Sequence, residues 1–224
     1  MLTPPILMTG ASFSSLKTAS AAGATVKALV KFGSASILER MIAALRAAQG
    51  VGRVVVVGPS ELATNPAASA ADAVLPEGNT APANLLLGLD WLAERERSER
   101  VLIVTADLPL ITAVHVRDLV ARFPSEDVCV PVIRREDFLA RFPDTTDNYV
   151  KLSDGAWTLG CAILVRPEAV LRQRAHLEAV FNARKDQLAM ARLLGPGFVT
   201  RLLMRRVSVS DIAAKCGQLL GCSG

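Results

Sequence analysis

The chain has 224 residues, of which 51% are apolar and only 4% aromatic, and this length is sufficient for one large α/β domain with a buried core. The net charge of +4 is small, and the basic residues are scattered without interleaved aromatic residues, so the composition argues against nucleic-acid binding. No apolar run approaches the roughly 20 residues needed to cross a bilayer, so we expect no membrane-spanning segment.

The side chains best suited to metal binding or redox chemistry are widely separated. They are Cys129, Cys161, Cys216, Cys222, His115 and His176, and no C-x-x-C pair is present. This spacing argues against a zinc site, and scattered thiols predict a reducing, cytoplasmic location. The apolar segment at residues 4–8 is too short for a signal peptide.

The first predicted strand leads directly into a turn of small residues. Residues 5–9 end at Thr9 and are followed by Gly10, Ala11 and Ser12. A turn of this kind at the carboxyl edge of a sheet can aim backbone N–H groups at phosphate oxygens. It holds one glycine rather than a full glycine fingerprint, and similar turns occur without a ligand, so both interpretations stay open.

A strand–helix–strand unit is expected next. Apolar residues recur at helical spacing over residues 37–48, with Ser36 as the expected N-cap and Glu39 completing a capping box. Residues 51–58 form the following predicted strand. Together with the strand at residues 5–9, this order predicts a right-handed crossover and parallel pairing.

The most informative stretch is a buried strand predicted at residues 101–106. Before it, residues 59–82 are small, polar and proline-containing, with a short strand at 73–75. Residues 79–84 form a turn into a helix predicted at 85–97. Four consecutive apolar, mostly β-branched residues open the 101–106 stretch, which is typical of a central strand buried on both faces.

Asp107 follows this strand directly. A central strand excludes an ionised carboxylate from its interior, so the strand ends near Thr105 and Asp107 lies just beyond its carboxyl end. Ligands bind at this edge in open α/β sheets, and a carboxylate there suits Mg²⁺. The alternative is that Asp107 caps the next helix, but Thr112 is the better N-cap, so we favour a metal site.

The second half of the chain is predicted to add a hairpin and several helices. The turn signal Ser153-Asp154-Gly155 predicts a hairpin over residues 149–158. The other expected elements are a helix at 115–122, a strand at 127–133, a short helix and loop at 134–147, a strand at 160–167, helices at 167–182 and 185–194, and an amphipathic basic tail at 198–221. We predict a single domain over residues 1–224, with 134–160 as a hairpin insertion and 198–224 as a C-terminal helical tail.

Three segments of the chain resemble the nucleotidyltransferases of the molybdenum-cofactor guanylyltransferase-like (MobA-like) superfamily. Residues 27–39 match its pattern of lysine, short apolar run, glycine and helix. Residues 101–112 match its metal-aspartate strand, and residues 149–167 match the segment that closes the acceptor side. The resemblance covers about residues 5–197. It implies a three-layer, Rossmann-like α/β fold of the GT-A type, with a mostly parallel sheet and a small β-hairpin subdomain.

The resemblance also implies an activity and roles for particular residues. Such enzymes move a nucleoside monophosphate from an NTP to a phosphate or hydroxyl group of a small-molecule acceptor and release pyrophosphate. Asp107 would hold Mg²⁺ and Lys27 would supply a positive charge to the phosphates, so these two are the expected catalytic residues. The expected nucleotide-binding residues are Thr9, Gly10, Ala11, Ser12 and Asn84. The acceptor candidates are Tyr149, Lys151, Gly160, Arg184 and Lys185.

Several of these residues have a purely structural alternative. Lys27 is equally well explained as a solvated residue at a strand edge, and Asn84 as a helix N-cap. For Arg184 and Lys185 the structural alternative, the charged start of a helix, is favoured.

The chain departs from the family pattern at three positions. The usual phosphate loop has two glycines and a following basic residue, whereas here Gly10 is followed by Ala11, Ser12 and Phe13. Val26 stands where a proline commonly precedes the lysine, and Cys161 stands where an asparagine is common. These departures keep open a catalytically degenerate domain that binds a nucleotide or metabolite in a regulatory role.

Two further alternatives concern the reaction and the assembly. A GT-A glycosyltransferase is a weaker hypothesis, because those enzymes usually carry a D-x-D motif and Asp107 stands alone. In the tail, the apolar residues Leu202, Leu203 and Val207 are expected to pack either on the body of the protein or on a second subunit of a homodimer.

Overall fold

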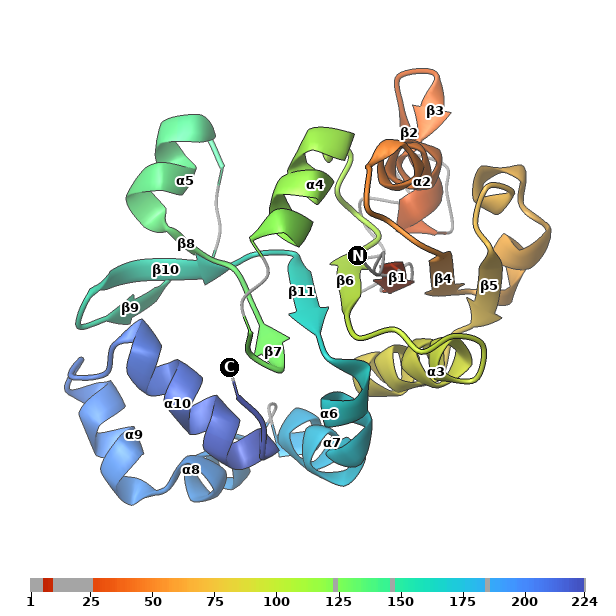
Figure 1. Ribbon diagram of the computed structural model, residues 1–224. Coiled ribbons are helices and arrows are strands. Elements are labelled where there is room, and N and C mark those ends of the chain that lie inside the picture. The colour runs from red at the N-terminus through yellow and green to blue at the C-terminus, as the bar shows by residue number, and fades with distance from the viewer. Residues whose placement is uncertain (1–5, 10–25, 123–124, 146–147, 184–185, 224) are drawn as a thin grey trace.

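The computed structural model describes residues 6–9, 26–122, 125–145, 148–183 and 186–223. The strands of its main sheet are β1 (Ile6–Thr9), β4 (Val54–Gly58), β5 (Ala73–Pro76), β6 (Val101–Thr105), β7 (Val128–Cys129) and β11 (Ala162–Val165). Within the described residues they form one six-stranded sheet in the order β5-β4-β1-β6-β11-β7 (Figure 1). The first four strands in that order are parallel, and β11 is antiparallel to both of its neighbours.

Helices cover both faces of this sheet (Figure 1). One layer contains α2 (Ile37–Ala47) and α4 (Ala113–Ala121), and the other contains α3 (Ala81–Ala93), α6 (Pro167–Arg172) and α7 (Arg174–Ala183). Successive strand residues point to opposite faces, so Val54 and Val56 pack with α2, whereas Val55 and Val57 pack with α3. This three-layer arrangement confirms the predicted fold class.

Several short elements lie between β1 and β5 in the described part of the chain. They are the 3₁₀ helices η1 (Lys27–Leu29), η2 (Ser60–Thr64) and η3 (Pro66–Ala68), and the two-stranded ribbon of β2 (Lys31–Phe32) and β3 (Ala35–Ser36). The ribbon ends at Ser36, which is also the N-cap of α2. The capping box predicted from the sequence is present: Glu39 N–H donates to Ser36 Oγ at 3.2 Å, and Ser36 N–H donates to Glu39 Oε2 at 2.6 Å.

Removal of this cap should measurably destabilise the protein. We expect Ser36→Ala to lower the free energy of unfolding by about 1 kcal/mol, because N–H groups of the first turn of α2 lose their acceptor. Urea unfolding followed by circular dichroism measures the change. Ser153→Ala, at an exposed turn, is the matched control, and equal unfolding midpoints for the two variants would contradict the prediction.

A second, smaller sheet stands beside the first. Its strands are β8 (Val132–Arg134), β9 (Val150–Leu152) and β10 (Gly155–Leu159), in the order β8-β10-β9, and α5 (Arg135–Arg141) contacts β8 and β10. The antiparallel pairing of β9 with β10 confirms the predicted hairpin. The hairpin gains β8 as a third strand, which the sequence did not indicate.

The strand predicted at residues 127–133 is wrong as a single element. It is divided into β7, which belongs to the main sheet, and β8, which belongs to the small one. Pro131 lies between them and has no N–H group to continue the ladder. Its carbonyl accepts a 2.7 Å hydrogen bond from Gly160 N–H, where the returning chain crosses between the same two sheets.

Two predicted helices also differ from the structure. The helix expected at 85–97 is α3, which begins four residues earlier because Thr80 caps it and Pro82 lies in its first turn, where proline is tolerated. The helix expected at 167–182 is two helices, α6 and α7, because the backbone of Gln173 leaves the helical conformation (φ −101°, ψ 19°).

The C-terminal segment is helical and is joined to the rest of the chain. It contains α8 (Gln187–Leu194), α9 (Pro196–Leu203) and α10 (Val209–Leu220). Val207 is fully buried, and its carbonyl accepts a 2.9 Å hydrogen bond from Ser153 N–H in the hairpin turn. Part of the tail therefore packs on the body, whereas Leu203 is 80% exposed. Among the described residues, no helix has the length and apolar composition that a bilayer span requires.

Candidate functional site

An ion pair marks the carboxyl edge of the main sheet. Lys27 Nζ lies 2.7 Å from Asp107 Oδ2, although the two residues are 80 positions apart in the sequence. Asp107 follows the end of β6 by two residues, as predicted. The side chains are 42% and 32% exposed, respectively, so this pair remains accessible to a ligand from solvent.

Lys27 is held by a 3₁₀ turn rather than by a strand. Leu29 N–H donates to Val26 O at 3.0 Å, Val30 N–H donates to Lys27 O at 3.1 Å, and Ala28 is buried beneath the turn. The structural alternative that places Lys27 at a strand edge is therefore wrong. The buried residues on either side of Lys27 anchor the turn and leave the lysine as its outward-facing charge.

The segment after Asp107 is fixed to α2. Leu108 N–H contacts Met41 Sδ at 3.4 Å, and Arg40 Nε donates to Pro109 O at 3.3 Å. Thr112 then caps α4 by accepting from His115 N–H, so Asp107 is not needed as a cap. The structure agrees with the sequence on this point and leaves the Asp107 carboxylate available for binding.

The charge of Asp107 is maintained by its partner. Partial burial acts to raise the pKa of this carboxyl group, but the hydrogen bond from Lys27, the interaction with the Thr105 side chain and the charge of Lys27 together outweigh that effect and lower the pKa below its ordinary value. Asp107 is therefore ionised at neutral pH. Its negative charge is present above the lowered pKa and is lost only as the pH falls through it.

The donor groups at this edge fit Mg²⁺ better than a transition metal. The described residues contain no cluster of three His, Cys, Asp or Glu side chains able to hold a metal. Mg²⁺ does not require such a cluster, since it often binds through one or two carboxylates, several waters and substrate phosphates. Thr105 Oγ1, two residues before Asp107, is buried, and its interaction with the Asp107 carboxyl group places a second oxygen beside that carboxylate.

The start of β11 lies beside this edge. Thr105 N–H donates to Cys161 O at 3.1 Å, so the acceptor candidate Gly160 lies close to the strand that carries Asp107. A Cβ atom at Gly160 would lie 3.1 Å from Pro131 O, a separation that is too short for ordinary packing. The close approach of the two backbones therefore explains why a residue without a side chain stands at position 160.

The other acceptor candidates lie on the small sheet. The Tyr149 ring packs edge-on against Phe138, with ring centroids 6.3 Å apart, and Arg135 lies over it at 5.7 Å. Tyr149 Oη is buried and has no hydrogen-bond partner among the described residues. Lys151 is exposed on β9. None of the described contacts connects Tyr149 or Lys151 with Asp107, so their roles stay predictions.

Asn84 has a structural task. It is buried within α3, and its Oδ1 accepts a 2.6 Å hydrogen bond from Gly78 N–H. The alternative that Asn84 is a helix N-cap is wrong, because Thr80 caps this helix. Asn84 instead fixes the loop after β5, which leaves the sheet at the same carboxyl edge as Asp107.

The remaining candidates are only partly described. Thr9 ends β1 and pairs with Thr105 in the adjacent strand, which places its backbone at the carboxyl edge. The residues Gly10, Ala11, Ser12, Arg184 and Lys185 lie outside the described residues, so their predicted roles are not tested. The residue that sequence reasoning missed is Thr105, for which the available signal was a hydroxyl group on the last residue of a buried strand.

Comparison with known proteins identifies the family of this chain. Residues 18–201 match the model of the MobA-like NTP transferase domain, and the chain therefore belongs to that family. The resemblance proposed from the sequence is thus confirmed.

A protein and two solved structures illustrate the relationship. A phosphoenolpyruvate guanylyltransferase of Sphaerobacter thermophilus is 36% identical over 102 residues, which are 45% of this chain and 49% of that protein, so the match spans about half of the relative. A hypothetical transferase from Thermus thermophilus has a TM-score of 0.85 at 28% identity, over 98% of this chain and 90% of that one. A 4-diphosphocytidyl-2C-methyl-D-erythritol synthase from Anaerococcus prevotii, at 12% identity, shares the fold with a TM-score of 0.57, over 79% of this chain and 74% of that one.

Proposed function

We propose that the protein is a Mg²⁺-dependent nucleotidyltransferase that transfers a nucleoside monophosphate from an NTP to a small phosphate-bearing acceptor and releases pyrophosphate. The observation that carries this proposal is the Lys27–Asp107 pair at the carboxyl end of β6, in a chain of the MobA-like NTP transferase family. The pair combines a carboxylate for a divalent cation with a mobile cation for phosphates, and both are accessible to solvent.

The curated relative suggests the donor and the acceptor. Its name specifies guanylyl transfer to phosphoenolpyruvate, so we propose GTP as the donor and a phosphorylated carboxylic acid of the phosphoenolpyruvate type as the acceptor. In this reaction, an oxygen of the acceptor phosphate forms a bond to the α-phosphorus of GTP. The bond between the α-phosphorus and its bridging oxygen breaks, and pyrophosphate leaves with that electron pair. The acceptor phosphate is already anionic, so no base has to remove a proton.

The chain contributes charge and position to this step. Bound Mg²⁺ would act as a Lewis acid for phosphate oxygens. Ionised Asp107 would hold it, and the contacts of the following segment with Met41 and Arg40 keep this carboxylate in place. Lys27 leaves Asp107 when phosphates arrive and stabilises the negative charge that develops on them.

The direct test is pyrophosphate release with a matrix of substrates. GTP, CTP, ATP and UTP are each incubated with phosphoenolpyruvate, with and without Mg²⁺, and the product is identified by mass spectrometry. We expect release only with GTP, the acceptor and the metal together. Binding of a nucleotide without turnover would support a degenerate regulatory domain instead, and hydrolysis of a sugar nucleotide without NTP turnover would support a glycosyltransferase.

A further inference from the structure

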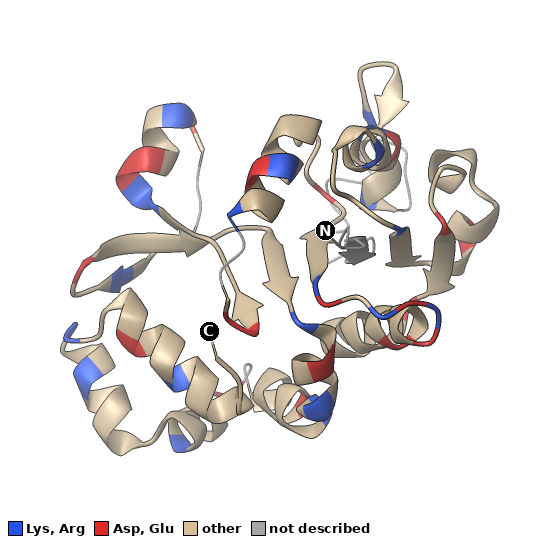
Figure 2. Cartoon of the chain, in the orientation of Figure 1, with Lys and Arg blue, Asp and Glu red and all other residues tan. Residues whose placement is uncertain are grey.

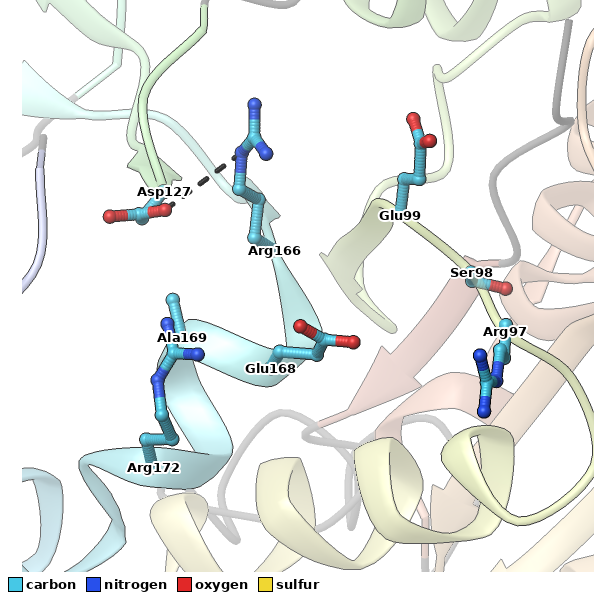
Figure 3. Close-up of a pocket in the computed structure, with 8 residues that line it drawn as sticks. All are labelled: Arg97, Ser98, Glu99, Asp127, Arg166, Glu168, Ala169 and Arg172. Carbon is cyan, nitrogen blue, oxygen red and sulfur yellow. Dashed lines mark ion pairs between the residues drawn. The ribbon is translucent and has the colours of Figure 1, made fainter.

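A charged cavity lies at the opposite edge of the main sheet from Asp107. Its volume is about 470 Å³, within the range of small-molecule sites. It forms where the loop between α3 and β6, the start of β7 and the junction of β11 with α6 meet (Figure 3). Glu99 precedes β6 and Asp107 follows it, so this cavity is separate from the proposed active site. Its charged lining residues are Arg97, Glu99, Asp127, Arg166, Glu168 and Arg172.

One of these charged residues, Asp127, already accepts hydrogen bonds from the C-terminal segment. Asp127 Oδ2 accepts hydrogen bonds from the N–H and the hydroxyl group of Ser223, both at 3.0 Å. Arg166 reaches the same carboxylate only loosely, with Nε 3.8 Å from Oδ1, which is beyond hydrogen-bonding distance. Arg166 Nε is buried without a hydrogen-bond partner among the described residues. The guanidinium group of Arg166 therefore has a donor without a hydrogen-bond acceptor at the wall of the cavity.

Three further charges at the cavity have no partner in the described part of the chain. The hydrogen bonds and ion pairs between described residues include none from the side chains of Arg97, Glu99 or Glu168. Arg172, by contrast, lies near enough to Asp127 for the two charges to interact. Charged segments of both signs gather where β6 begins and β11 ends (Figure 2). Opposite charges that line one cavity without pairing leave room for a ligand that pairs with both.

Charges of both signs lie around the cavity (Figure 3). Arg166 and Arg172 lie on the side of Asp127. Glu99 lies on the opposite side, as does Arg97, and Glu168 lies between the two sides. Guanidinium groups bind phosphate and carboxylate with paired hydrogen bonds, and a carboxylate accepts hydrogen bonds from an amine. We propose that this cavity is a binding site for a small dipolar molecule, which places a phosphate or carboxylate group at Arg166 and Arg172 and an amine at Glu99 and Glu168.

Isothermal titration calorimetry with matched probes tests this proposal. O-Phosphoethanolamine and β-alanine carry the same amine on the same two-carbon spacer and end in a phosphate and a carboxylate, respectively. Inorganic phosphate, propionate and ethylamine represent the separate halves. We expect at least one of the two dipolar probes to bind about tenfold or more tightly than either of its halves, and the comparison between them identifies the anionic group. Equal binding of probe and halves, or no binding of any compound at about 10 mM, would overturn the proposal.

Substitutions show whether binding occurs in this cavity. Arg172→Gln and Glu99→Gln should each lower the affinity of the protein for the dipolar probe by roughly 10- to 100-fold, because each substitution removes a hydrogen bond to a charged group. Arg117→Gln, at an exposed position on α4, is the control for a lost surface charge. Lys27→Ala should leave probe affinity unchanged. Loss of binding in Lys27→Ala would assign the probe to the Asp107 edge, and unchanged affinity in both cavity variants would likewise overturn the inference.

Discussion

Replacement of Asp107 by alanine is expected to lower pyrophosphate release by about 10³-fold or more, because a bound metal contributes several kcal/mol of transition-state stabilisation and each ~1.4 kcal/mol is a tenfold change in rate. Asp107 is the described carboxylate that follows the central strand at the ligand-binding edge, and no described cluster of His, Cys, Asp and Glu offers a substitute. The loss is measured as kcat/KM with GTP, phosphoenolpyruvate and Mg²⁺.

A loss of activity in Asp107→Ala can be assigned to the missing carboxylate only if the variant is folded. Asp107 is partly exposed and its principal partner is Lys27, so removal of the carboxylate leaves the buried strand β6 unchanged. Asp118→Ala, at an exposed position on α4, is the control for the loss of one surface carboxylate. Circular dichroism and thermal unfolding should be similar for the two variants. Undiminished turnover in a folded Asp107→Ala protein would refute the role of this residue.

Local sequence signals accounted for most of the central fold. The run Val101–Val104 predicted a strand buried on both faces, and it forms the middle of the sheet. Ser36 with Glu39, and Thr112, predicted helix starts that the structure confirms. In each case the residues that determine the structure are adjacent or three to four positions apart, so that the relevant interaction lies within a single element.

Interactions across sheets were not accessible to the same reasoning. Pro131 and Gly160 both stand at points where the chain passes from one sheet to the other, and their close approach depends on partners far apart in the sequence. The division of residues 127–133 between two sheets follows from this crossing. A short apolar run that contains a proline has the same appearance whether it ends a strand or links two strands.

The candidate site was predicted residue by residue but not as an arrangement. Asp107 could be placed from its position after a buried strand, whereas Lys27 was singled out through a family pattern. Nothing in the spacing indicated that the two side chains pair at 2.7 Å. The charged cavity was not predicted either, because its walls come from three separate segments and each contains only ordinary surface charges.

The Lys27–Asp107 pair leads to a prediction for Lys27→Met in which metal binding becomes tighter while turnover becomes slower. In the absence of nucleotide, Lys27 neutralises Asp107 and competes with a divalent cation for Oδ2. Its removal should therefore tighten Mn²⁺ binding to the nucleotide-free protein, as measured by electron paramagnetic resonance. The same substitution should lower kcat by about 10²- to 10³-fold, because a preorganised positive charge is lost from the phosphates.

The combination of effects separates a catalytic lysine from a structural one. If Lys27 served only to stabilise the turn at residues 27–29, Lys27→Met would lower thermal stability and would leave Mn²⁺ affinity unchanged or weaker. Lys31→Met, at an exposed position on β2, controls for the loss of a nearby lysine and should change neither quantity. Tighter Mn²⁺ binding together with slower turnover requires that one ammonium group holds Asp107 before the substrates bind and contacts the phosphates afterwards. Weaker Mn²⁺ binding, or unchanged turnover, would show that the Lys27–Asp107 pair only stabilises the fold.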